Sequence, residues 1–245
     1  MTKLKNKPVH LKAGLYASLV FAFLTAITLT FAMIAIPPSG PYCPANCMNY
    51  PFSELLDYYP RDYYWMYLAV FQFVAFVFFV VSIHFSAPEE RKIFSFTGVA
   101  FAVIAAALLM ADLFVQFTVV PVSVMKGETE GIALLTQYNG HGIFIALEEL
   151  GYWMMSLSFL CFSPVFIGKD RMNRFIRLLF VIQFVLMWFF FLYYIIKYGI
   201  ELEYRFEVAA ITINWLTAIV AGVIIGIRYI HMLKIIRHKN QNLKL

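Results

Sequence analysis

Six long apolar stretches constrain this chain more than any other feature of its sequence. A helix needs about 20 predominantly apolar residues to cross the hydrocarbon core of a bilayer. The stretches that reach this length are residues 14–36, 64–85, 93–119, 143–167, 176–196 and 208–230. None of them alternates strictly between apolar and polar residues, as β-barrel strands do. The sequence therefore predicts an all-α, polytopic membrane protein with a bundle of six transmembrane helices.

The composition agrees with a membrane protein. Hydrophobic residues make up 62% of the chain and charged residues only 13%, against about 25% charged residues in an ordinary soluble domain. These values exclude a soluble globular enzyme, a disordered tail and a nucleic-acid-binding domain. The first apolar stretch is longer than the roughly 7–15 apolar residues of a secretory signal, so we expect it to be retained. Residues 1–245 are expected to form a single domain.

The basic residues predict the orientation of the helices. Most Lys and Arg residues lie in the N-terminal segment, beside the loops that follow the second and fourth stretches, and from Arg228 onward. The exceptions are Arg61, Lys126, Lys197 and Arg205. Because cytoplasmic loops carry the excess of Lys and Arg, we expect a multi-pass protein of the cell membrane with both termini in the cytoplasm. The predicted partners are the bilayer and, on the cytoplasmic side, anionic lipid headgroups.

The longest predicted loop, residues 37–63, is rich in proline and tyrosine. Its prolines exclude one continuous helix, and its tyrosines favour the membrane–water interface. We therefore expect this segment to form a cap on the outer surface of the membrane. Cys43 and Cys47 within it can form a disulfide in an oxidising compartment or remain free thiols. Their spacing differs from that of redox and zinc pairs, which disfavours a chemical role.

Small residues recur at four-residue intervals in the sixth stretch, at Ala218, Gly222 and Gly226. Such a stripe lets another helix approach closely. The partner is either a neighbouring helix of the same bundle, which we favour, or a second copy of the chain in a homodimer. Asn214 continues the stripe by one turn and is expected to point into the bundle.

Polar residues within the predicted helices are the candidate functional residues. Asp112, Glu148 and Glu149 need an explanation, because an ionised carboxylate in hydrocarbon costs at least about 2.5–3.5 kcal/mol on insertion scales. Counting 1.5 Å of rise per residue places all three in the outer half of the membrane. The polar residues expected at comparable depth include His141, Tyr152, Gln116 and Asn214.

Angular positions favour one polar pocket built from these residues. At 100° per residue, His141, Glu148 and Tyr152 fall on one face of the fourth stretch. The simplest arrangement is a pocket in the outer half of the bundle, walled by the third, fourth and sixth helices. Glu149 points about 100° away from Glu148, and the sequence leaves open which of the two faces the pocket.

The buried acids allow several functions. Neighbouring carboxyl groups in a low-dielectric medium cannot all be charged, so at least one should be protonated. The favoured hypothesis is binding, or proton-coupled transport, of a small polar or amphipathic solute at a site centred on Glu148. One alternative is an intramembrane enzyme that uses Glu148 or Asp112 as an acid or base on a lipid-like substrate. Another is a non-catalytic assembly or sensor subunit, in which polar residues only join helices.

Known catalytic and cofactor motifs are absent from the sequence. It contains no phosphate-binding loop, dinucleotide fingerprint, nucleophile elbow or zincin motif. Of its 5 histidines, only His141 is expected near the polar pocket, which excludes a three-histidine zinc site there. The sequence predicts neither a metal site nor a particular cofactor, and it leaves open whether the protein is an enzyme.

Overall fold

The computed structural model describes residues 7–35, 37–168 and 170–242, which form helices and turns without a strand. Six of the helices are long and apolar enough to cross a membrane, so the predicted fold class is confirmed. Ile36, the last residue of the first apolar stretch, lies outside the described residues. So do four of the basic residues that predict the orientation, Lys3, Lys5, Lys169 and Lys244. The orientation of the termini stays a prediction.

The six long helices coincide with the six apolar stretches. They are α2 (Lys7–Ile34), α3 (Tyr64–Ser86), α4 (Lys92–Thr118), α7 (Ile143–Phe162), α8 (Arg171–Tyr198) and α9 (Tyr204–Asn242). The shorter elements are α5 (Val120–Met125), α6 (Ile132–Leu135) and the 3-10 turns η1 (Gly40–Tyr42), η2 (Ser53–Tyr58), η3 (Arg61–Tyr63), η4 (Glu89–Arg91) and η5 (Ser163–Val165). The largest difference from prediction is α9, which begins before its apolar stretch and continues well beyond it.

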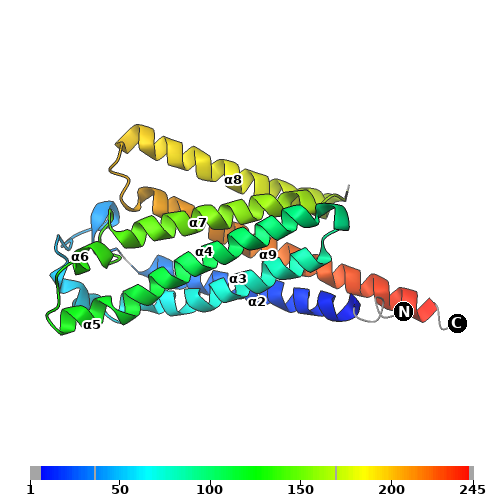
Figure 1. Ribbon diagram of the computed structural model, residues 1–245, viewed down its shortest axis with the longest axis horizontal. Coiled ribbons are helices and arrows are strands. Elements are labelled where there is room, and N and C mark those ends of the chain that lie inside the picture. Colours follow the sequence, from blue (N-terminus) through cyan, green and yellow to red (C-terminus); the bar gives the residue numbers. More distant parts are fainter. Residues whose placement is uncertain (1–6, 36, 169, 243–245) are drawn as a thin grey trace.

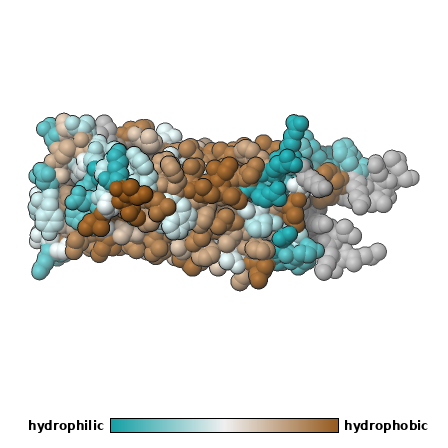
Figure 2. All heavy atoms as spheres, turned by 90° about the horizontal axis from the view of Figure 1, so that it is seen from above, coloured by the Kyte–Doolittle hydropathy of each residue, from teal (hydrophilic) through white to brown (hydrophobic). Residues whose placement is uncertain are grey.

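Five of the long helices form a ring, and the sixth packs outside it. Helix α2 packs against α3 and α9, α4 packs against α3 and α7, and α7 closes the ring by packing against α9. Helix α8 lies against α7 and α9 and diverges from them toward the end opposite the termini (Figure 1). A broad apolar belt covers the middle of the molecule, with hydrophilic residues gathered toward both ends (Figure 2), as a membrane-spanning bundle requires.

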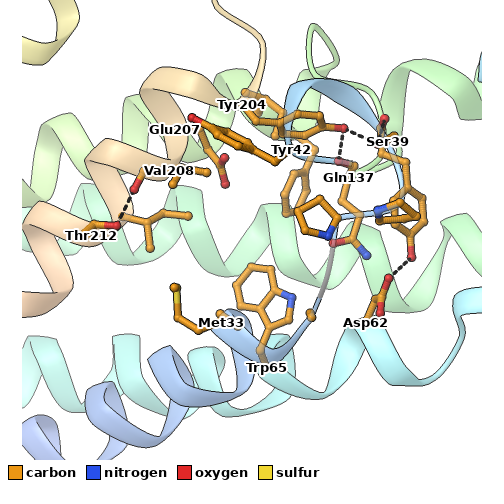
Figure 3. Close-up of a pocket in the computed structure, with 18 of the residues that line it drawn as sticks. Met33, Ser39, Tyr42, Asp62, Trp65, Gln137, Tyr204, Glu207, Val208 and Thr212 are labelled. Carbon is orange, nitrogen blue, oxygen red and sulfur yellow. Dashed lines mark hydrogen bonds between the residues drawn. The ribbon is translucent and has the colours of Figure 1, made fainter. Parts of the chain in front are cut away.

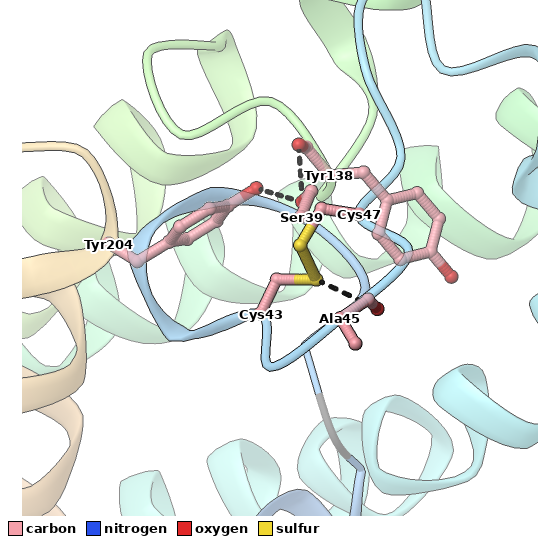
Figure 4. The surroundings of a disulfide bond; sticks show 6 residues. All are labelled: Ser39, Cys43, Ala45, Cys47, Tyr138 and Tyr204. Carbon is pink, nitrogen blue, oxygen red and sulfur yellow. Dashed lines mark hydrogen bonds between the residues drawn. A yellow bond between two sulfur atoms is a disulfide. The ribbon is translucent and has the colours of Figure 1, made fainter.

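Residues 37–63, the cap, fold over the end of the bundle opposite the termini, which we call the cap end (Figure 1). The cap contains three short 3-10 turns, which confirms that it is not one continuous helix. Its buried apolar side chains pack with residues of α5, α6 and the following loop; the cluster comprises Met48, Phe52, Leu55, Val120, Ile132, Ala133 and Tyr138. The sulfur atoms of Cys43 and Cys47 are bonded to each other within the cap (Figure 4).

The small-residue stripe of α9 packs against α2 of the same chain. A Cβ atom at Gly222 would lie 2.8 Å from both Ala22 Cβ and the carbonyl oxygen of Ser18, so only glycine allows this approach. Gly226 faces Leu19 on the next turn of α2. The stripe therefore packs against a helix of the same bundle, as favoured from the sequence, and a homodimer stays a prediction.

Candidate functional site

Four carboxyl groups lie together in the cap half of the bundle. Asp112 of α4 and Glu148 of α7 are each 2% exposed, and Glu207 of α9 is 7% exposed. Glu149 follows Glu148 on α7 and is half-buried. The other three are electrostatic neighbours of Glu148. Glu148 is therefore the centre of the carboxyl cluster, defined here as these four residues.

The carboxyl cluster has no basic partner among the residues that the structure describes. The ion pairs found there are Arg61–Asp62, Lys92–Glu89 and Arg205–Glu203. Neighbouring carboxyl groups in a low-dielectric medium cannot all be ionised. At least one carboxyl group of the cluster is therefore expected to be protonated.

Several buried polar atoms around the carboxyl cluster lack a hydrogen-bond partner within the described part of the chain. They are Asp112 Oδ2, Glu148 Oε2, Tyr152 Oη, Trp215 Nε1 and both amide atoms of Gln72. Buried polar groups are normally paired, so such a concentration needs an explanation. The side chains come from α3, α4, α7 and α9. The ring interior is therefore polar and underpaired in its cap half, which is typical of a site that receives a ligand or a proton.

A cavity of about 170 Å³ lies where the cap meets α2, α3, α7 and α9. Its walls are mostly apolar and aromatic, with Trp65, Trp215 and Tyr42 among the largest side chains. Glu207 is part of the wall, and Figure 3 shows its carboxyl group directed from α9 toward Trp65 and Met33. Because Glu207 is also an electrostatic neighbour of Glu148, this one side chain links the cavity with the carboxyl cluster.

The roof of the cavity is held by hydrogen bonds between three segments. Ser39 of the cap donates from Oγ to the carbonyl oxygen of Tyr138 at 2.7 Å. Tyr204, the first residue of α9, donates from Oη to the carbonyl oxygen of Gln137 at 3.1 Å and lies 2.9 Å from Ser39 Oγ (Figure 4). These bonds tie the cap to the loop before α7 and to the start of α9.

Asp62 also lines the cavity, but its charge is already compensated. Arg61 pairs with it at 2.7 Å, and Tyr138 donates to its second carboxylate oxygen at 3.4 Å. Burial raises the pKa of the Tyr138 phenol, and the neighbouring Tyr63 and Asp62 raise it further. Tyr138 therefore stays protonated and keeps its donor role. Among the acids of the cavity wall, Glu207 is left as the carboxyl group free to meet a ligand.

The structure brings together some of the sequence-predicted site residues and separates others. Asp112, Glu148 and Tyr152 meet inside the ring, and Glu149 lies at its edge. Gln116 lies elsewhere: its amide nitrogen donates to the carbonyl oxygen of Leu135, and its amide oxygen accepts the backbone N–H of Gln137 at 2.9 Å. Gln116 thus holds the segment after α6 against α4.

Asn214 belongs to a second polar network, separate from the carboxyl cluster. Gln183 of α8 donates to Asn214 Oδ1 at 3.1 Å, and Ser156 of α7 donates to Gln183 Oε1 at 3.1 Å. Asn214 also donates to the carbonyl oxygen of Ala210 at 2.9 Å. All three side chains are buried, and they join α7, α8 and α9 as interhelical hydrogen bonds do. Asn214 does point into the bundle, but it has a structural partner there.

The structure places His141 on the surface. It precedes Gly142, the N-cap residue of α7, and its side chain is exposed. Because His141 lies outside the helix, the angular argument that placed it above Glu148 does not apply to it. Glu207 differs from His141 in the opposite sense: it lies outside the apolar stretch predicted from the sequence, yet it is buried in the structure. The signal that could have identified it is its position one residue before the apolar run that begins at Val208.

Comparisons with family models, with curated proteins and with solved structures give no match. In the described ranges, no group of three or more His, Cys, Asp or Glu residues is arranged to hold a metal ion. The function must therefore be inferred from the cavity and the carboxyl cluster.

Proposed function

We propose that this multi-pass membrane protein binds a small amphipathic solute in the cavity beneath the cap, and that the carboxyl cluster exchanges a proton with the bound solute or with water. The observation that carries this proposal is the position of Glu207. It lines the cavity and is an electrostatic neighbour of Glu148.

The cavity has the character of a small-molecule site. Such sites are mostly apolar and contain a few polar groups that orient the ligand. Here Trp65 and Phe144 supply apolar wall, and Glu207 supplies an acceptor. Two further residues of the wall, Gln137 and Trp215, carry buried N–H donors without a partner within the described residues. A solute with an apolar body and a polar head satisfies both parts of this lining.

The proposal of proton exchange is supported by the positions of three acids, which lie at increasing depth from the cap end of the bundle. Measured along their helices at 1.5 Å per residue, Glu207, Glu148 and Asp112 lie about 5, 8 and 9 Å from the cap-end termini of α9, α7 and α4. The other titratable groups facing them are Glu149 and Tyr152 of α7, Tyr204 of α9 and Tyr42 of the cap. A solute that interacts differently with the protonated and the ionised form of Glu207 couples its binding to protonation, and this coupling is reciprocal. Transport of the solute would use the same residues.

Isothermal titration of the purified chain in detergent tests the binding proposal. The probes are 2-phenylethylamine, 2-phenylethanol and phenylacetate, which have one shape and three charges. At least one probe should bind to the wild type and lose its binding in Ile211→Trp, because Ile211 lines the cavity. Leu216→Trp is the matched control, since Leu216 lies on the same helix and is 50% exposed. Binding that survives Ile211→Trp, or no binding of any probe, would contradict the proposal.

Thermal unfolding tests the role of the acids independently of any ligand. Functional residues tend to reduce stability, so Glu207→Gln, Glu148→Gln and Asp112→Asn should leave the unfolding temperature unchanged or raise it. Gln183→Leu is the contrasting variant, because Gln183 joins three helices and its loss should lower that temperature. If all three acid variants are destabilised as strongly as Gln183→Leu, the carboxyl cluster is structural and the proton-exchange proposal is wrong.

A further inference from the structure

We infer that the solute of this cavity is a small organic cation, a protonated amine on an apolar body, held by Glu207 and by the aromatic side chains of the wall. The inference rests on the proposed function and adds the chemical class of the ligand.

Glu207 lines the cavity and is only 7% exposed. A negative charge on this buried carboxyl group is costly in the membrane interior unless a positive charge lies beside it. Within the described ranges, no basic side chain forms an ion pair with Glu207. An ammonium group placed beside Glu207 would supply the missing positive charge.

The basic residues nearest in the sequence to the cavity wall are occupied elsewhere. Arg205 precedes Glu207 on α9, but its guanidinium lies 3.3 Å from Glu203 and 4.2 Å from the centre of the Tyr198 ring. Arg61 is paired with Asp62 at 2.7 Å. The protein therefore compensates one acid of the cavity wall, Asp62, and leaves the other, Glu207, open to a ligand.

The wall of the cavity is rich in aromatic side chains. Its rings belong to Tyr42, Trp65, Tyr138, Phe144, Tyr204 and Trp215. A cation is attracted to the face of an aromatic ring within about 6 Å, and most strongly to tryptophan. The centres of the Trp65 and Trp215 rings are 6.3 Å apart, so the two largest rings of the wall are neighbours. A carboxylate ligand would be repelled by Glu207 and would gain nothing from these rings.

The volume of the cavity limits the size of the ligand. A volume of about 170 Å³ is smaller than the roughly 300–1,000 Å³ of sites for drug-sized ligands. It fits an amine with one ring or a short alkyl chain.

The three probes of the binding experiment also test this inference. In the wild type, 2-phenylethylamine should bind at least about fivefold more tightly than 2-phenylethanol, because a hydrogen bond or ion pair to a charged group exceeds the neutral interaction by about 1 kcal/mol or more. Phenylacetate should bind most weakly. Glu207→Gln should remove the preference for the amine and leave binding of the alcohol within about twofold. Glu203→Gln is the matched control, since Glu203 lies just before α9 begins, does not line the cavity and pairs with Arg205.

A second variant keeps the test independent of Glu207. Trp65→Leu should weaken binding of the amine more than binding of the alcohol, because it removes a cation–π contact while keeping an apolar wall. Equal binding of amine and alcohol by the wild type would overturn the inference. So would a preference that persists in Glu207→Gln. In either case the proposed function is still supported if Ile211→Trp abolishes binding. If no probe binds at the cavity, both the proposed function and this inference are wrong.

Discussion

Replacing Gly222 by alanine should force α9 away from α2. The new Cβ would lie 2.8 Å from Ala22 Cβ and 2.8 Å from the carbonyl oxygen of Ser18, whereas carbon atoms in good contact are about 3.5–4.0 Å apart. Neither obstacle can rotate away, because one is backbone and the other is a Cβ atom. The two helices must therefore separate by nearly 1 Å at this point, by the same contact distances.

The size of the effect follows from comparison with a neighbouring position. A Cβ at Gly226 would meet Leu19 Cδ2 at 3.2 Å, and this flexible side chain can move. Alanine has about 1 kcal/mol higher helix propensity than glycine, and this gain is common to Gly222→Ala and Gly226→Ala. The difference between the two variants isolates the packing cost, which is about 1–3 kcal/mol for an overpacked core.

The assay is reversible unfolding in mixed micelles with a rising mole fraction of SDS, followed by far-ultraviolet circular dichroism. Gly222→Ala should be less stable than Gly226→Ala by the packing cost, and Gly226→Ala should be at least as stable as the wild type. Equal stability of the two variants, or a more stable Gly222→Ala, would show that α2 and α9 do not approach each other as closely as the structure has them.

Three further predictions concern the polar network, the cap and the start of α8. Asn214→Leu and Gln183→Leu should each lower the free energy of unfolding, and a double-mutant cycle should give a coupling of about 0.6 kcal/mol; zero coupling would contradict their hydrogen bond. Replacing Cys43 and Cys47 by serine should lower the unfolding temperature, since closing so short a loop contributes about 2 kcal/mol in the chain-entropy model; the reductant-treated wild type should behave alike. Asp170→Ala should cost about 1 kcal/mol, because Asp170 caps α8. The hydrogen bond that Asp170 accepts from the backbone N–H of Asn173 lowers the pKa of Asp170. The stabilisation is therefore present above about pH 4 and is lost as the pH falls through the lowered pKa. A stability difference between Asp170→Ala and the wild type that persists at pH 2 would refute this prediction.

The transmembrane helices could be predicted because each apolar stretch is long enough for its composition alone to decide its structure. The fold of the cap could not. Its short 3-10 turns are held by packing of Met48, Phe52 and Leu55 against α5 and α6, and these contacts join segments that are far apart in the sequence. Helix α5 was also missed as a separate element, although Pro121 near its start is a typical sign of a new helix.

The misplaced histidine has a local explanation. His141 lies between Gly140 and Gly142, and α7 begins only at Ile143. Glycine on both sides disfavours a helix through that position, so an angular argument that extends the helix back to His141 uses residues that are not helical. The same argument works for Glu148 and Tyr152, which lie well inside α7 and are both buried.

Glu207 shows why hydropathy alone could not define the site. Hydropathy identifies runs of apolar residues of the kind that face lipid. The last such run begins at Val208, and the last helix was therefore predicted to begin there. In the structure α9 begins at Tyr204, because the cap and the loop before α7 cover its first turn and Tyr204 bonds to both. A carboxyl group in that turn is buried by protein and needs no apolar neighbours in the sequence. An acid that lies just outside an apolar run, next to a loop able to fold over it, therefore belongs among the candidates for a buried site. Including Glu207 moves the candidate site from α7 to the boundary between the cavity and the ring interior, where the proposed solute and proton would meet.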